Sequence, residues 1–252
     1  MEDERQNKIN HILADFAVYL NPDLMNEEYS DAIRNVEFHK EKMEEYLQLI
    51  TDIYYAWHKT LRYSVFFAEF YSSSDSIEDF EALNHHIHSY LQDVTILKNK
   101  IEVFLNVLKN DIKKTTDNKE NVTSFFKFGT DRNREIFENI TKHRDPHHHK
   151  GMRFLDGDLL KAENAHRASQ TFNNPTFDAM LNPEFKPDLM KKLETEKREG
   201  FESAKTRWIE IADNNSIQMS GYLNELMQTI IQPMYDYLGI MPVQEYLGIE
   251  NV

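Results

Sequence analysis

Glycine and proline are scarce in this chain, with seven of each among 252 residues. Tight turns depend on these two residues, because glycine tolerates positive φ angles and proline holds φ at a value that suits turns. A β-sandwich or a β-barrel needs many such turns, whereas a helical bundle needs few. The scarcity therefore predicts an all-α fold in which a few long helices form a bundle.

Apolar residues recur at intervals of three and four along most of the chain, which is the period of an amphipathic helix. We expect long antiparallel helices over about 30–71, 76–114, 119–143 and 188–231. A short helix precedes them, and another is expected from Asp158. The second long helix carries one apolar stripe, formed by Ile87, Leu91, Val94, Leu97, Ile101, Phe104, Leu105 and Leu108.

The segment "NNPTFDAMLNPEFKPD" interrupts this pattern with three prolines and is interpreted as a loop. It suggests three parts: an N-terminal helix over 1–29, a helical bundle over 30–165, and a loop with a long C-terminal helix over 166–252, packed on the bundle. The tetrapeptide "YLGI" occurs at 237–240 and again at 246–249. Two copies this short indicate two similar helix ends rather than a repeat architecture.

Composition excludes several classes of function. The chain has no cysteine, so disulfides, thiolate zinc sites and cysteine nucleophiles are excluded. It begins "MEDERQNKINHI" without the apolar core of a signal peptide, and no apolar run approaches ~18 residues, so we expect a cytoplasmic protein with no membrane partner. The net charge of −14 repels nucleic acid at long range, and binding it would require a local basic patch.

The stretch "ITKHRDPHHHKGMRF", residues 140–154, concentrates four histidines, two arginines and two lysines. Pro146 cannot continue the preceding helix but suits the first turn of a new one, with Asp145 as its N-cap. The free N–H groups of such a helix start, together with Arg144, Lys150 and Arg153, would form a local anion pocket. Histidine transfers protons near neutral pH, and the arginine guanidinium binds phosphate through two parallel hydrogen bonds.

A second histidine cluster lies on the helix expected over 76–114. Glu81, Asn84, His85, His88 and Gln92 share one helix face at three-to-four spacing, beside the apolar stripe. Such a face is usually only solvated. Its functional interpretation is one wall of a site whose other wall is the 140–154 stretch.

Arg144 and His149, separated by four residues, resemble the R-x(4-6)-H motif of HEPN domains, and the helical setting over about 40–165 is similar to theirs. Many members of that family are metal-independent endoribonucleases in toxin–antitoxin, abortive-infection and antiviral (anti-phage) defence systems. The resemblance implies RNA as substrate, no cofactor, and a homodimer that brings two motifs into one cleft. It also implies a possible cognate antitoxin or regulatory protein. Pro146 inside the motif departs from the family pattern.

The resemblance implies a role for each residue of the motif. Arg144 would bind the scissile phosphate, His149 would act as general base or acid, and Asp145 would orient them. The histidine run leaves open whether His147 or His148 is the second proton carrier. The expected substrate contacts are Lys150, Arg153, His85 and His88.

Two other interpretations remain open. In the first, the chain is a non-catalytic helical interaction module, as some HEPN proteins are. In the second, it is a metal-binding helical protein in which two histidines of "HHH" and either His85 or His88 bind one ion. No H-E-x-x-H and no paired E-x-x-H occurs, so we predict no metal ligand. Phosphate-binding glycine loops and the G-x-S-x-G motif are also missing, which removes support for nucleotide hydrolysis and esterase chemistry by those routes.

Overall fold

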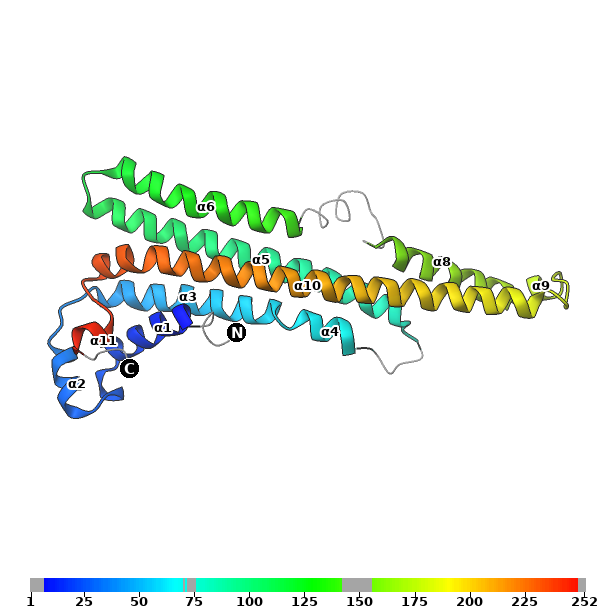
Figure 1. Ribbon diagram of the computed structural model, residues 1–252, viewed down its shortest axis with the longest axis horizontal. Coiled ribbons are helices and arrows are strands. Elements are labelled where there is room, and N and C mark those ends of the chain that lie inside the picture. The colour runs from blue at the N-terminus through cyan, green and yellow to red at the C-terminus, as the bar shows by residue number, and fades with distance from the viewer. Residues whose placement is uncertain (1–6, 70, 72–75, 142–155, 249–252) are drawn as a thin grey trace. The chain divides into compact units, whose positions relative to one another are not determined.

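The structure is a computed structural model, and it describes residues 7–69, 71, 76–141 and 156–248 (Figure 1). All regular secondary structure within these ranges is helical, and they contain no strand. The predicted all-α class is therefore confirmed. Across the same ranges, no helix combines the length and the apolar composition that crossing a bilayer requires.

The chain forms two compact units. The first comprises Met1–Lys59, Val94–Asn139 and Ser216–Val252, and the second comprises Thr60–Asp93 and Ile140–Asn215. Two long helices contribute to both, because α5 (Asp79–Thr115) and α10 (Lys186–Leu238) each begin in the second unit and end in the first.

The first unit contains the C-terminal parts of α5 and α10. Helices α1 (Asn7–Leu20), α3 (Lys40–Thr60) and α6 (Lys119–Thr141) belong to the same unit. A short turn joins α5 to α6, and the two helices run antiparallel (Figure 1). Three short elements complete the unit: η1 (Pro22–Leu24), α2 (Glu27–Arg34) and α11 (Val243–Tyr246). Its fully buried side chains include Phe16, Tyr46, Ile50, Ile53, Leu97, Ile101, Phe104, Phe137, Met227 and Met234.

The second unit contains α4 (Tyr63–Glu69), α8 (Gly157–Phe172) and α9 (Pro175–Asp178), with the N-terminal parts of α5 and α10. The short helix expected from Asp158 is α8. Helices α8 and α10 run antiparallel, with α9 at the turn between them (Figure 1). A ring cluster of Tyr63, Phe67, Tyr90 and Trp208 fills the core of this unit.

The prediction of a single helix over about 30–71 is wrong. Three helices, α2, α3 and α4, occupy that range. Between α2 and α3 the backbone N–H of His39 donates to the carbonyl of Leu238 at 3.0 Å, and the ring of Phe38 packs against Tyr19. Tertiary contacts thus stabilise a break that no glycine or proline marks. Helix α4 begins at Tyr63, whose hydroxyl donates to the buried carboxylate of Asp93 and whose ring packs at a tilt against Tyr90.

The predicted apolar stripe of α5 is confirmed, since all eight of its residues are buried. Helix α10 continues beyond the predicted end at 231 and accommodates Pro233. Buried Tyr235 and Leu238 explain this, and Tyr235 donates to Asp15 Oδ2 at 2.8 Å. Both "YLGI" segments are helix ends as predicted, because Gly239 and Gly248 follow α10 and α11 with φ angles of 77° and 65°.

Candidate functional site

Seven of the nine predicted site residues lie outside the described residues: Arg144, Asp145, His147, His148, His149, Lys150 and Arg153. The other two, His85 and His88, lie on α5 in the second unit. His85 is exposed and its ring centroid is 6.0 Å from that of His86, whereas His88 is half-buried. The predicted polar face of α5 therefore exists, and its role stays a prediction.

Helices border the histidine-rich stretch on both sides. Helix α6 ends at Thr141, with Ile140 buried, and α8 begins at Gly157. The motif itself lies outside the described residues, so its predicted placement directly after a long helix stays a prediction.

Asp156, the first described residue after the stretch, is fixed by several hydrogen bonds. As the N-cap of α8, its carboxylate accepts the backbone N–H of Asp158 at 2.8 Å and of Leu159 at 3.4 Å. Arg207 Nη2 donates to both of its oxygens at 2.6 Å, and Trp208 Nε1 donates at 2.9 Å. The Asp156 side chain is almost fully buried. The start of α8 is thereby attached to α10, and sequence analysis missed this contact.

Metal ligation has no geometric support in the part of the chain that the structure describes. No three His, Asp or Glu side chains come together there as ligands of one ion. The "HHH" run lies outside those residues, so the metal interpretation of the stretch stays untested.

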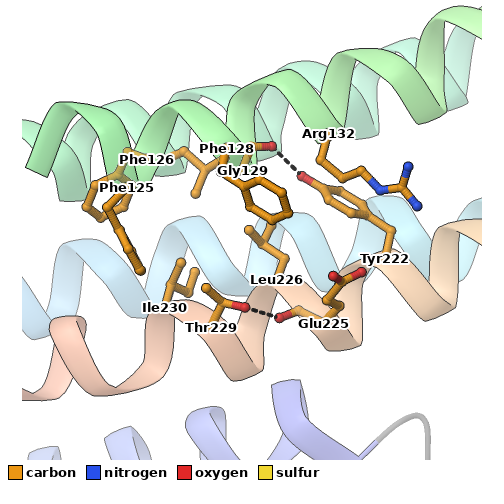
Figure 2. Close-up of a pocket in the computed structure, with 11 residues that line it drawn as sticks. Phe125, Phe126, Phe128, Gly129, Arg132, Tyr222, Glu225, Leu226, Thr229 and Ile230 are labelled. Carbon is orange, nitrogen blue, oxygen red and sulfur yellow. Dashed lines mark hydrogen bonds between the residues drawn. The ribbon is translucent and has the colours of Figure 1, made fainter. Parts of the chain in front are cut away.

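A concave apolar surface lies in the first unit, between α6 and α10. Figure 2 shows Phe125 and Phe128 of α6 facing Leu226 and Ile230 of α10 across a pocket. Phe128 is 63% exposed and Phe125 is 40% exposed, which is unusual for aromatic side chains. Leu105 of α5, Phe126, Gly129, Tyr222 and Thr229 complete the apolar part of the wall.

Close contact between α6 and α10 forms the base of this pocket. The hydroxyl of Tyr222 donates to the carbonyl of Gly129 at 3.1 Å. A Cβ atom at Gly129 would lie 3.4 Å from a methyl of Leu226. Burial raises the pKa of Tyr222 above its usual value, and the carboxylates of Glu102 and Glu225 raise it further, so this hydroxyl stays a hydrogen-bond donor at neutral pH.

The concave surface continues along the two helices as a more polar stretch, lined by Arg132, Glu135, Ile136 and Asn139 from α6 and by Ile217, Gln218, Gly221 and Glu225 from α10. We call the pocket and this continuation the α6–α10 groove. Ile217 is 57% exposed. The groove is thus apolar at its Phe125 end and mixed at its Asn139 end.

Charge in the groove is unevenly paired. Arg132 donates to Glu135 at 2.7 Å, and this hydrogen bond is the main cause that raises the pKa of the Arg132 guanidinium. Glu225 is exposed, and its carboxylate raises the pKa of the Arg132 guanidinium further without a direct hydrogen bond to it. The rim therefore presents one carboxylate beside the aromatic pocket.

Comparisons with known proteins gave no match, whether to a protein-family model, to a curated protein or to a solved structure. Sequence analysis had singled out neither the groove nor its aromatic residues. The segment "SFFKF" carries the signal, because Phe125, Phe126 and Phe128 cannot all face the core from one helix.

Proposed function

We propose that the chain is a metal-independent endoribonuclease of the HEPN type. The observation that carries the proposal is the Arg144–His149 spacing within a dense cluster of histidine and basic residues. The all-helical secondary structure of the described residues supports it, as does helix α6, which is described as far as Thr141, three positions before Arg144.

The proposed reaction follows from the residue types. The RNA 2′-hydroxyl attacks the adjacent phosphorus while His149 accepts its proton, so that a 2′-oxygen–phosphorus bond forms. The bond from phosphorus to the 5′-oxygen breaks, and His147 or His148 returns a proton to that oxygen. Arg144 stabilises the charge on the phosphoryl oxygens, and Asp145 orients the pair. The products carry a 2′,3′-cyclic phosphate and a 5′-hydroxyl.

Substrate contacts in the proposal come from Lys150, Arg153, His85 and His88. They would supply the local positive charge that RNA binding requires in a chain of net charge −14. A homodimer, a role in toxin or anti-phage defence, a cytoplasmic location and an antitoxin or regulatory partner belong to the same proposal.

Product analysis tests the proposal. Purified protein is incubated with end-labelled RNA in excess EDTA, and the product ends are identified by phosphatase and kinase treatment. We expect cleavage with cyclic phosphate ends. Cleavage that disappears in EDTA and returns with one divalent ion would support the metal interpretation, and an absence of cleavage under all conditions would refute the enzyme proposal.

A second candidate function is a helical interaction module, favoured by the exposed aromatic residues of the α6–α10 groove. The two candidates respond differently to substitution. Changes at Arg144 or His149 should abolish an enzyme while leaving the groove intact, whereas changes at Phe128 should impair only binding.

A further inference from the structure

The apolar end of the α6–α10 groove presents two exposed aromatic side chains on a concave surface of the first unit. Phe125 and Phe128 project from α6 over Leu226 and Ile230, so that a half-open pocket separates the two helices (Figure 2). Burying such side chains would contribute about 25 cal/mol of favourable free energy for each Å² of apolar surface removed from water. Exposed apolar surface that is concave and bordered by polar residues is typical of a binding site.

The polar continuation of the groove encloses about 450 Å³, whereas the apolar end is much smaller, and its size limits what enters there. The cavity volume inside is about 20 Å³. Pockets for small-molecule ligands are far larger, on the order of 300–1,000 Å³. A space this small accepts the end of one aliphatic side chain, as when a residue of one helix inserts between four residues of another.

The length of the groove indicates the form of the occupant. From Phe125 to Asn139, α6 rises about 21 Å at ~1.5 Å per residue, which is roughly four helical turns. The second apolar position, between Ile136 and Ile217, lies about three turns from the pocket. A helix laid along the groove meets both apolar positions with one face.

Charge indicates the composition of that helix. Arg132 is paired with Glu135 and is also attracted to Glu225 on the opposite rim, so two carboxylates share one guanidinium and leave one net negative charge beside the pocket. The net charge of −14 attracts a cationic segment and repels a second copy of this chain. A lysine or arginine one turn from the inserted residue would reach Glu225.

We propose that the α6–α10 groove binds an amphipathic helix of a partner protein, with one aliphatic side chain inserted among Phe125, Phe128, Leu226 and Ile230 and a basic side chain beside Glu225. The partner is a protein with a basic amphipathic helix. This inference is independent of the proposed ribonuclease activity, because it rests only on described residues of α6 and α10 and assigns no part to the proposed catalytic residues.

A helical peptide library tests the proposal on the full-length chain. Peptides of about 16 residues, which span the groove at ~1.5 Å per residue, are displayed with their exposed positions randomised and selected on the protein. We expect enrichment of peptides that combine one aliphatic residue with a lysine or arginine one turn away. Selected peptides are then synthesised, and their Kd is measured by fluorescence anisotropy.

Matched variants assign the binding to the groove. Phe128→Ala should weaken the selected peptides at least about tenfold, as loss of a contact residue at the centre of an interface does. Tyr55→Ala, which removes an aromatic residue that is 68% exposed on α3, should not change their Kd. Glu225→Lys should change the selected charge from basic to acidic, and Glu210→Lys on α10 should not. Thermal melts confirm that each variant is folded.

Four outcomes overturn the proposal. One is enrichment of peptides without the aliphatic and basic pair. Another is that the selected peptides bind the unaltered chain, Phe128→Ala and Glu225→Lys with equal affinity. A third is that the selection enriches no peptide. The last is self-association that Phe128→Ala abolishes, which would assign the groove to a second copy. An Arg144→Ala variant that still binds peptides separates this result from a failure of the ribonuclease proposal.

Discussion

Gly200 lies where α10 packs closely against α8. A Cβ atom added there would lie 2.6 Å from the carbonyl oxygen of Asp158 and 3.3 Å from the Cβ of Ala162. Because the first of these is a backbone atom, the helices themselves must move apart. The absence of a side chain at this position therefore determines the packing of the second unit.

Gly200→Ala should lower the free energy of unfolding by about 1–3 kcal/mol, the usual cost of overpacking. Gly221→Ala is the matched control, since it is also helical and its Cβ would meet no atom within 4 Å. It should stabilise the chain by up to about 1 kcal/mol, because alanine is the better helix former. Urea unfolding of both variants measures this, and equal effects would contradict the assigned contact.

Asp111 is the most heavily hydrogen-bonded carboxylate of the first unit. Burial acts to raise its pKa, but Lys114 at 2.7 Å, Lys42 at 2.8 Å and Tyr46 at 3.2 Å outweigh burial, so its pKa lies below the usual 3.8. The same contact raises the pKa of Lys42. Because the folded-state pKa is the lower one, the contribution to stability is complete above the unfolded-state pKa. It is lost as pH falls through the folded-state value.

Asp111→Asn should therefore cost about 1–3 kcal/mol of stability at neutral pH, the usual cost of leaving buried hydrogen-bonding groups without their charged partner. The difference from the unaltered chain should shrink as pH falls well below 3.8. Urea unfolding over a series of pH values measures it. A difference that stays constant with pH would show that the carboxylate charge has no part in it.

Among the elements, α5 could be predicted from sequence because its apolar stripe keeps one face over the whole helix. The ends of α10 and α11 could also be predicted, since glycine follows each of them. The break at residues 35–39 could not, because it depends on a hydrogen bond from His39 to Leu238, about two hundred positions away along the chain. The groove was missed for a similar reason, since α6 alone does not show that Phe125 and Phe128 face α10.

Helix α8 should depend on the contact of Asp156 with Arg207. Asp156→Ala removes the N-cap of α8, which lowers the free energy of unfolding by ~1 kcal/mol. It also leaves the indole N–H of buried Trp208 without its acceptor, which lowers the free energy of unfolding by about 1–3 kcal/mol. Hydrogen exchange should become faster first in the N-terminal turn of α8. Lys161→Ala, whose exposed side chain pairs only with Asp158 on the surface, is the control and should leave exchange nearly unchanged. Unaltered protection in Asp156→Ala would refute this role.

For the molecule as a whole, the predicted catalytic site rests on a motif that lies outside the described residues. Experiments in solution therefore test it. The ribonuclease proposal implies a dimer, because two motifs would share one cleft. Light scattering should then give twice the chain mass of 30.0 kDa at micromolar concentration. A mass of one chain at all concentrations would contradict the shared cleft.

The most direct test of the proposed function compares two arginine variants in the RNA cleavage assay with EDTA present. Arg144→Ala should lower the cleavage rate at least about a hundredfold, because the guanidinium stabilises charge in the transition state. Arg134→Ala, an exposed arginine of α6 that is 4.0 Å from Glu138, removes the same charge outside the motif and should leave the rate nearly unchanged. Equal rates for both variants, at unchanged thermal stability, would contradict the assignment of Arg144 to the reaction.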